Sequence, residues 1–389
     1  MLKKVDVFAP PENPYKTLHY MTEMLASALV KQGIQTRLFD NKIAKDPKKF
    51  IGMVISDPPD CTISFNGLLP DDEGNFLCDY IGIPHVAILV DSPQRFFSLV
   101  KSPYTIIGCI DQFHERFFKM FEGTHAFFLP HGVDAGIEAD LDSKRPYDVT
   151  VLASFKDPDD IRKGWSEKYS SDICQILDEA ADLTLERPQV SFIEAFSQCM
   201  KSPTAQKRVD PTKLIYKDLF SDLEDYVKAL DRTETIHAIE DSEIHVFGDG
   251  DWDRFSSKTK AKIVTHGPIT FYEAIEVMKE SKIVLNCTPH IKYGGHERFF
   301  TAYMCGALPI TALYPWLESQ FKPKHEAVYY TPPNWGDMNN LVHTYLSDKA
   351  ERQSVIENGV NITRENHTWD RRVETLMDNL PPILDILTN

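Results

Sequence analysis

The feature that most constrains this chain is a regular alternation of short apolar runs with longer segments in which apolar residues recur at helical spacing. Leu18, Met21 and Leu25, for example, follow one another at the spacing of a single helix face. Strands that alternate with helices build βαβ units and parallel sheets. The twelve runs predicted as strands are residues 5–9, 36–40, 62–65, 85–90, 106–110, 126–129, 147–152, 243–247, 262–264, 282–286, 308–311 and 327–330.

This pattern predicts an α/β protein with two Rossmann-like, doubly wound domains that face a cleft. A chain of 389 residues holds two domains of ordinary size. A polar stretch separates the two sets of strands, which places an N-terminal domain at 1–140 and a C-terminal domain at 141–366. No strand pattern appears between about 162 and 240, so we predict a helical insertion there, and a final helix at 367–389. Ligands of such folds bind at the carboxyl ends of the strands.

The charge and the cysteine pattern exclude several classes of function. A formal net charge of −16 argues against nucleic acid as the main partner and against a polybasic membrane anchor. No run of about 18 apolar residues is present, so no membrane span is expected. Seven scattered cysteines, none at C-x-x-C spacing, indicate reduced thiols. We therefore expect a cytoplasmic protein.

A pair of glycines in the second half offers the strongest candidate for an anion site. Gly294 and Gly295 precede a helical pattern, and glycines let backbone N–H groups approach an anion closely. The start of a helix also carries a partial positive charge. Arg298 can add a charge-assisted bond to a diphosphate. His296 can donate to the same phosphates, and Glu297 can accept from ribose or sugar hydroxyls.

Each of these features has a structural alternative. Gly248 and Gly250 after a buried strand also suit an anion, but a lone G-x-G is more often an ordinary turn at the end of a strand. Arg298 has the alternative of a structural salt bridge. His266 with Gly267 has the alternative of a turn that leads into a helix.

The ordered motifs of the second half resemble the C-terminal lobe of the spore-maturation-protein-type (CgeB-like) glycosyltransferases. That family is related to glycosyltransferases with family 1/4-type C-terminal domains and has the two-lobed GT-B fold. The resemblance covers most of the chain outside the insertion at 162–240. The stretches that carry it are His266-Gly267 with Tyr272, 281–286, 295–298, 305–307, 367–369 with Arg371-Arg372, and, in the first half, 90–93 and 129–134.

The resemblance implies that a sugar passes from a nucleotide-sugar, expected to be a UDP-sugar, onto an acceptor held by the first domain. It implies no cofactor and no metal, because helix termini and basic side chains neutralise the diphosphate. It also implies that the terminal helix, with Thr368 as its N-cap, crosses back to the first domain. The donor-binding residues expected in the second domain are Ser154, Gly248, Asp249, His266, Tyr272, Asn286, Gly294, Gly295, His296, Glu297, Arg298 and Thr301.

One position departs from the family pattern. In many relatives the helix after the glycines carries a glutamate, used for the donor ribose, four residues before a Cys-Gly or Ala-Gly pair. Here Thr301 stands in that position before Cys305, and Glu297 lies one turn earlier. The identity of the nucleotide and the retention of activity therefore stay open at this point.

Two residues of the first domain are candidate catalytic groups. Asp91 follows a buried strand and can act as a base toward an acceptor hydroxyl, although a turn at the strand end is the alternative. His131 lies near the domain boundary and can position the donor or the acceptor, with a linker turn as the alternative. No metal site is predicted, because the histidines lack partners at ligand spacing.

Other functions stay open beside the transferase, whose acceptor would be a protein, a glycan or a small molecule. The first is a non-catalytic or regulatory protein that binds nucleotide-sugars with the same fold, motivated by Thr301. The second is a nucleotide-sugar epimerase. A dehydrogenase is disfavoured, because Ala9-Pro10-Pro11 follows the first strand where a G-x-G-x-x-G motif would stand.

Overall fold

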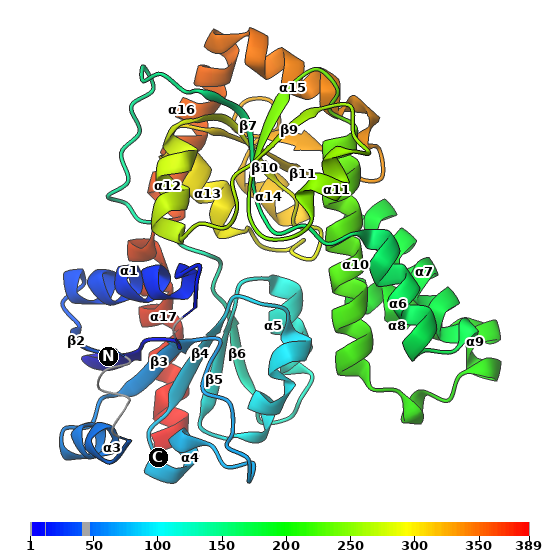
Figure 1. The fold of residues 1–389 in the computed structure, drawn as a ribbon. Helices are drawn as coiled ribbons and strands as arrows, with labels where there is room; N and C mark the ends of the chain where they lie inside the picture. Colours follow the sequence, from blue (N-terminus) through cyan, green and yellow to red (C-terminus); the bar gives the residue numbers. More distant parts are fainter. Residues whose placement is uncertain (1, 12, 41–46, 389) are drawn as a thin grey trace. The chain divides into compact units, whose positions relative to one another are not determined.

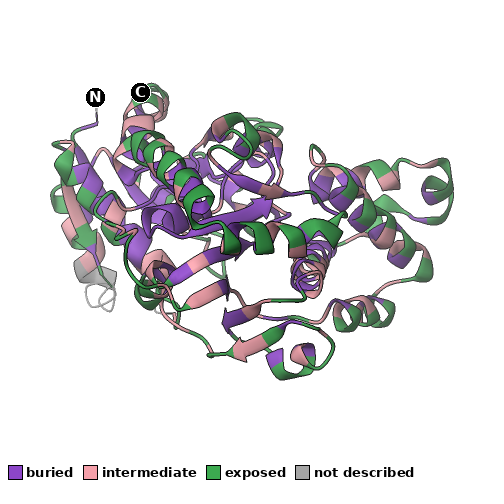
Figure 2. Ribbon diagram, turned by 90° about the horizontal axis from the view of Figure 1, so that it is seen from above, coloured by how far each residue is buried: buried purple, intermediate pink, exposed green. Residues whose placement is uncertain are grey.

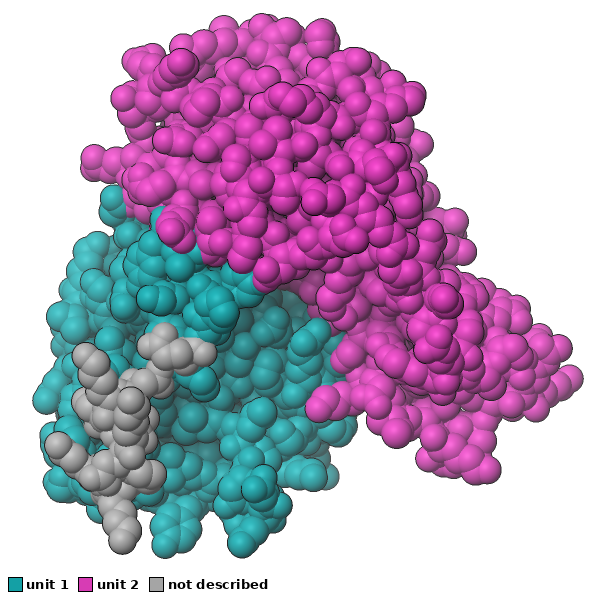
Figure 3. All heavy atoms as spheres, in the orientation of Figure 1, with its two compact units in different colours: residues 1–136, 270–272, 364–389 teal, residues 137–269, 273–363 magenta. Residues whose placement is uncertain are grey.

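The computed structural model describes residues 2–11, 13–40 and 47–388. In these residues the chain forms two six-stranded parallel sheets and divides into two compact units (Figures 1 and 3). Unit 1 comprises Met1–Gly136, Thr270–Tyr272 and Arg364–Asn389, and unit 2 comprises Ile137–Ile269 and Glu273–Thr363. The predicted α/β class with two doubly wound sheets is confirmed, and each of the twelve predicted strands coincides with a strand of the structure.

Unit 1 is built on one parallel sheet with the strand order β2-β1-β3-β4-β5-β6. This is the flavodoxin-like order of doubly wound sheets, extended by one strand, rather than the Rossmann order. Its strands are β1 (Lys4–Phe8), β2 (Gln35–Phe39), β3 (Cys61–Phe65), β4 (His85–Leu89), β5 (Thr105–Cys109) and β6 (His125–Phe128). Its helices are α1 (Thr17–Lys31), α3 (Pro47–Ser56), α4 (Leu77–Ile81), η1 (Pro93–Lys101), α5 (Gln112–Lys119) and α17 (Trp369–Thr388).

The core of unit 1 joins the two ends of the chain. Strands β1, β3, β4 and β5 are buried along their whole length, as parallel strands covered on both faces must be. Figure 2 shows the buried parts of the ribbon in purple. Helix α17 packs beside α1. It adds Trp369, Val373 and Leu376 to the cluster that holds Val5 and Leu25. The last helix is therefore part of the hydrophobic core that the first strand begins.

Unit 2 has the strand order β12-β11-β10-β7-β8-β9, which is the Rossmann order when its strands are numbered from β7. The chain leaves β7 in one direction and returns to add β10 on the other side of it. Its strands are β7 (Tyr147–Leu152), β8 (Glu243–Phe247), β9 (Lys262–Thr265), β10 (Ser281–Asn286), β11 (Leu308–Ala312) and β12 (Val328–Tyr330). Its helices outside the insertion are α11 (Trp252–Ser256), α12 (Phe271–Lys279), α13 (Glu297–Met304), α14 (Pro315–Gln320), η3 (Trp335–Asp337), α15 (Met338–Ser347) and α16 (Lys349–Asn366). The first two residues of α12 and the last three of α16 belong to unit 1.

A helical insertion stands between β7 and β8 of unit 2. Figure 1 shows these helices packed on one another beside the sheet. Ser191 and Glu194 form a capping box at the start of one of them, which satisfies backbone N–H groups that the helix itself leaves free. The helices are α6 (Pro158–Lys168), α7 (Ser171–Glu186), α8 (Phe192–Met200), α9 (Pro203–Arg208), η2 (Pro211–Lys213) and α10 (Tyr216–His237).

A buried histidine in the sheet of unit 1 predicts a loss of stability in acid. His85 Nδ1 lies 2.7 Å from Thr62 Oγ1 and its Nε2 lies 2.9 Å from Ser64 Oγ. Burial lowers the pKa of His85 from 6.5 to about 3, so between those values the unfolded chain binds more protons than the folded one. Stability is therefore complete above pH 6.5 and falls as the pH drops toward 3, by up to about 1.4 kcal/mol per pH unit for one such histidine.

Denaturant unfolding between pH 7 and pH 4 measures this slope. We expect His85→Gln to make the slope shallower, while the same change at the exposed His343 leaves it as it is. An unchanged slope in His85→Gln would show that other groups cause the loss.

Candidate functional site

The carboxyl ends of β7 and β10 form the topological switch point of unit 2, where doubly wound sheets bind ligands. Ser154 follows β7 and is half-buried, and Asn286 is the last residue of β10 and is fully buried. The amide nitrogen of the Asn286 side chain donates to Thr311 Oγ1 at 3.1 Å, so its carbonyl oxygen has a defined direction. The fold thus brings together two predicted residues that lie far apart in the sequence.

Helix α13 begins close to this switch point, directly after the predicted glycine pair. Gly294 and Gly295 are both buried. A Cβ at Gly295 would lie 2.6 Å from the Phe300 ring and 2.9 Å from the Trp316 ring. The glycine is needed at 295 because aromatic rings fill the space on its inner side, a packing reason that the sequence pattern did not indicate.

His296 and Glu297 form a pair at the start of α13. His296 Nδ1 lies 2.7 Å from Glu297 Oε2 and 3.3 Å from the backbone nitrogen of Arg298. The shorter contact requires a proton between the two atoms, so we assign that proton to Nδ1, and the longer contact is then weak. Burial, followed by the positive charges of Arg298 and Lys228, lowers the pKa of His296 although Glu297 opposes them.

Arg298 is half-buried on the first turn of α13 and has no ion pair with a carboxylate among the residues that the structure describes. Its Nη1 donates to Asn286 Oδ1 over a long distance of 3.4 Å. Burial lowers the pKa of its guanidinium, which nevertheless stays charged at neutral pH. A half-buried cation with one weak neutral partner is suited to bind an anion.

A second guanidinium, which the sequence analysis missed, comes from the last helix of the insertion. Arg232 on α10 donates from Nη1 to the backbone carbonyl of Ser154 at 2.5 Å. Burial lowers the pKa of Arg232, and the positive charge of Arg298 acts in the same direction. Lys228 lies one turn earlier on α10. The available signal was the i, i+4 spacing of these two basic residues at the end of the insertion.

The neighbouring Asp231 holds this part of α10 in place. Its two carboxylate oxygens accept hydrogen bonds from Tyr330 Oη at 2.7 Å and from Trp335 Nε1 at 2.9 Å. Burial raises the pKa of Asp231 to about 6. The side chain therefore fixes α10 against the end of β12, and Arg232 is positioned as a consequence.

The glycines after β8 serve the contact between two loops. A Cβ at Gly248 would lie 2.1 Å from the Ala153 carbonyl oxygen, and one at Gly250 would lie 2.3 Å from the Phe155 carbonyl oxygen. The carbonyl of Asp249 accepts a hydrogen bond from Phe155 N at 2.7 Å, and the side chain of Asp249 is on the exposed part of the loop. These glycines therefore let the backbone after β8 lie directly against the backbone after β7.

Three other predicted donor residues lie elsewhere. His266 follows the edge strand β9, where its Nε2 lies 2.9 Å from His245 Nδ1 and its ring stacks on Phe247. Tyr272 belongs to unit 1, and its hydroxyl donates to Glu23 Oε2 at 2.7 Å. Thr301 is buried, and its hydroxyl donates to the Glu297 carbonyl one turn earlier. The fold does not bring their side chains to the switch point in the way it brings Ser154, Asn286 and Arg298.

The two candidate catalytic residues of unit 1 differ in exposure. Asp91 is exposed after β4, and its Oδ2 accepts a hydrogen bond from Asn66 Nδ2 at 2.8 Å. His131 is buried, and its carbonyl accepts a hydrogen bond from Arg372 Nε at 3.0 Å. A Cβ at Gly132 would lie 2.7 Å from the Trp369 ring. The segment around His131 is therefore packed tightly against the start of α17.

Two further chemistries find no support in the residues that the structure describes. Burial raises the pKa of Cys287, next to the switch point, to about 12, so this thiol is not a nucleophile at neutral pH. Within residues 2–11, 13–40 and 47–388, no group of three or more His, Cys, Asp or Glu side chains is placed to hold a metal ion.

No helix in that part of the chain has the length and apolar character needed to span a bilayer.

Known structures share the fold of two parallel sheets over almost the whole chain. The Anabaena protein Alr3699/HepE in complex with UDP and glucose is 12% identical, with a TM-score of 0.52 over 98% of this chain and 100% of that chain. AviGT4, a glycosyltransferase of avilamycin A biosynthesis, is 10% identical, with a TM-score of 0.57 over 98% of both chains. Sucrose-phosphate synthase from Thermosynechococcus elongatus is 9% identical, with a TM-score of 0.51 over 99% of this chain and 100% of that chain.

The chain has the GT-B fold. A family model described as "Glycosyl transferase-like" matches residues 224–378, so the match begins within α10 and includes Arg232 and Arg298. An uncharacterized protein of Aquifex aeolicus is 18% identical over 98% of this chain and 96% of its own length. The matched region of this GT-B protein therefore contains both guanidinium groups of the candidate site.

Proposed function

We propose that this GT-B protein is a glycosyltransferase that takes a sugar from a nucleotide-sugar donor, and that the donor is a UDP-sugar. The observation that carries the proposal is the convergence of Arg232 and Arg298 beside the start of α13, at the switch point of unit 2. Two guanidinium groups repel one another, so such a pair is favourable where an anion binds between them. The structural neighbour Alr3699/HepE is known in complex with UDP and glucose, which supports this choice of donor. The CgeB-like subtype is the finer assignment that we propose.

In this proposal the diphosphate accepts bonds from Arg298, Arg232 and the first backbone N–H groups of α13. These groups neutralise its charge, so the reaction proceeds without a metal ion. In unit 1 we propose Asp91, oriented by Asn66, as the base that takes the proton of an acceptor hydroxyl. The oxygen then attacks the anomeric carbon of the sugar, and the nucleoside diphosphate leaves. We propose that His131 positions the donor or the acceptor.

Ligand-induced stabilisation tests the donor site. We expect UDP and UDP-glucose to raise the melting temperature, since a ligand that binds only the folded state stabilises it by about 2.7 kcal/mol at 100 times its Kd. Uridine, which lacks the phosphates, should cause little change at the same concentration. EDTA should leave the shift with UDP intact. Equal shifts with uridine and UDP, or no shift with any nucleoside diphosphate, would contradict the proposed site.

A non-catalytic protein that binds nucleotide-sugars is the second candidate, and Thr301 favours it. The hydroxyl of this buried residue is already bonded to the Glu297 carbonyl. Thr301 thus offers a ribose no carboxylate, and one carboxylate oxygen of Glu297 is already paired with His296. Slow hydrolysis of UDP-glucose by the purified protein, lost in Asp91→Asn, would support the transferase. Binding of UDP-glucose without any release of UDP would favour the second candidate.

A further inference from the structure

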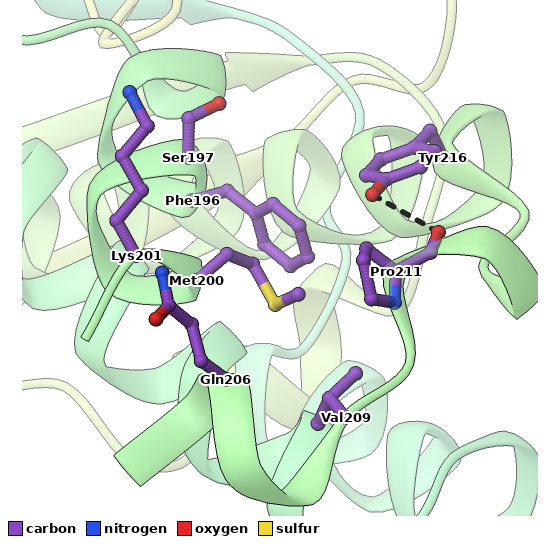
Figure 4. A pocket seen from close by; sticks show the side chains of 8 residues that line it. All are labelled: Phe196, Ser197, Met200, Lys201, Gln206, Val209, Pro211 and Tyr216. Carbon is purple, nitrogen blue, oxygen red and sulfur yellow. Dashed lines mark hydrogen bonds between the residues drawn. The ribbon is translucent and has the colours of Figure 1, made fainter. Parts of the chain in front are cut away.

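A hollow in the helical insertion of unit 2 is separate from the switch point. Its volume is about 460 Å³, which is in the range of ligand pockets. Figure 4 shows Phe196, Met200 and Val209 around the same space, with Lys201 on one side and Tyr216 on the other. The side chains come from the end of α8, the residue after α9 and the start of α10. The hollow is thus an apolar surface between three helix ends.

The segment around this hollow carries a net positive charge, whereas the chain as a whole is negatively charged. Residues 196–218 contain five basic and two acidic side chains, in a protein whose formal net charge is −16. Arg208 pairs with Asp172, and Lys213 lies 3.7 Å from Asp210. The other three basic residues are exposed and have no ion pair in the part of the chain that the structure describes: Lys201, Lys207 and Lys217. An acidic ligand would therefore gain charge complementarity here.

Exposed apolar side chains continue the surface beyond the hollow. Ile215 is 67% exposed and Tyr216 is 40% exposed, and they are consecutive in the sequence. Tyr216 is held by its hydroxyl, which donates to the Pro211 carbonyl at 3.2 Å. A rigid aromatic side chain beside an apolar hollow and exposed lysines is typical of a surface that binds an anchor side chain of a partner.

The length of α10 decides what kind of ligand can use both this hollow and the donor site. Tyr216 begins α10 and Arg232 lies on the same helix, about 24 Å further along it. A small acceptor cannot contact both ends of that distance. An extended peptide covers it with about seven residues, at roughly 3.3–3.6 Å each.

We propose that the hollow is a docking site for an acidic segment of a protein acceptor. The segment inserts an apolar side chain between Met200 and Tyr216, and one of its carboxylates lies near Lys201, which lines the hollow. Further carboxylates lie toward Lys207 and Lys217, the exposed residues that follow the lining residues Gln206 and Tyr216 in the sequence. A protein segment fits better than a lipid chain because the space is a short, open hollow and not a long groove. The role of the partner as acceptor rests on the proposed glycosyl transfer, whereas the docking itself does not.

Fluorescence anisotropy with the full-length chain and a labelled peptide, Glu-Asp-Glu-Leu-Phe-Glu-Asp-Glu, tests the proposal. We expect saturable binding that weakens with added salt. Lys201→Glu should weaken it at least about fivefold, because an attractive charge becomes repulsive. Met200→Glu should weaken it as well, by removing part of the apolar surface. Lys163→Glu, a matched change at an exposed lysine of α6, should leave binding unchanged. Melting temperatures of the variants exclude unfolding as the cause.

Several results would overturn the docking site. Absence of peptide binding is one, and equal affinity for peptides with Gly-Gly in place of Leu-Phe, or with lysines in place of the acids, is another. Capture by phosphatidylglycerol vesicles that depends on Lys201, without peptide binding, would replace the protein partner by a membrane surface.

The affinity for UDP distinguishes a failure of the docking site from a failure of the proposed function. Lys201→Glu should not change it, and a chain that binds the peptide but no UDP would retain the docking site and lose the proposed function.

Discussion

Arg298→Ala is expected to weaken the binding of UDP by well over tenfold. Removing one partner of a charge-assisted bond in a partly buried site costs about 2–4 kcal/mol, which is the free-energy equivalent of that loss. Arg298 is the half-buried cation on the first turn of α13, and its side-chain hydrogen bond to Asn286 is long at 3.4 Å. Calorimetric titration with UDP measures the change directly. Arg254→Ala is the matched control, because that arginine is exposed on α11 and pairs with Asp160.

The same variant should lose no stability in the absence of ligand. Burial disfavours the charged form of Arg298, although the nearby Glu297 favours it, and the positive charge of Arg298 in turn lowers the pKa of Arg232 on α10. Removing the guanidinium takes away this repulsion, so an unchanged or higher melting temperature is expected beside the weaker binding. An unchanged affinity for UDP in a folded Arg298→Ala protein would rule out this residue as the main phosphate contact. A lower melting temperature would assign Arg298 a structural role.

Ending the chain after Asn366 is expected to unfold unit 1 or prevent its folding. The deletion removes α17, which supplies Trp369, Val373, Leu376 and Leu380 to the core. It also removes two backbone hydrogen bonds of Val133, whose N–H donates to the His367 carbonyl and whose carbonyl accepts from Trp369 N. Thermal unfolding followed by circular dichroism measures the effect, because a chain without this helix should lack one of its cooperative transitions.

A point substitution in the full-length chain also tests whether α17 supports the core of unit 1. Trp369 is 4% exposed, and its ring meets Phe65 edge to face at 5.6 Å. Trp369→Ala should lower the free energy of unfolding by about 3–5 kcal/mol, the usual cost of removing a large buried aromatic side chain. Ile386→Ala on the same helix is the control, because Ile386 is 67% exposed and its loss should matter little. Similar stability of the two variants would mean that α17 does not support the core of unit 1.

The strands of both sheets could be predicted because their signal is local. A run of apolar residues between helical segments is visible within a few positions, and all twelve runs are strands in the structure. The order of the strands is not a local property. Unit 2 has the Rossmann order, whereas unit 1 begins β2-β1-β3. In unit 1 the third strand, β3, pairs with the first strand, whereas in unit 2 the third strand, β9, pairs with the second, β8. No residue pattern within the strands indicates this choice.

The candidate site also has a part that local sequence patterns predict and a part that they do not. Gly294, Gly295 and Arg298 are close in sequence, so the start of a helix with a basic side chain could be predicted from spacing alone. Arg232 could not, because it joins them only when α10 returns from the insertion and Asp231 is bound by Tyr330 and Trp335.

The sequence by itself determined the α/β class, the position of each strand and the helix start that carries Arg298. The tertiary structure decided which of the predicted residues lie close together. It also showed that several of them have a structural role within the fold. A Cβ at Gly248 would meet the Ala153 carbonyl, and the hydroxyl of Thr301 is bonded within its own helix. The physical reason is range: periodicity and helix-start signals act over a few residues, whereas a site at a switch point depends on contacts between segments that are distant in the chain.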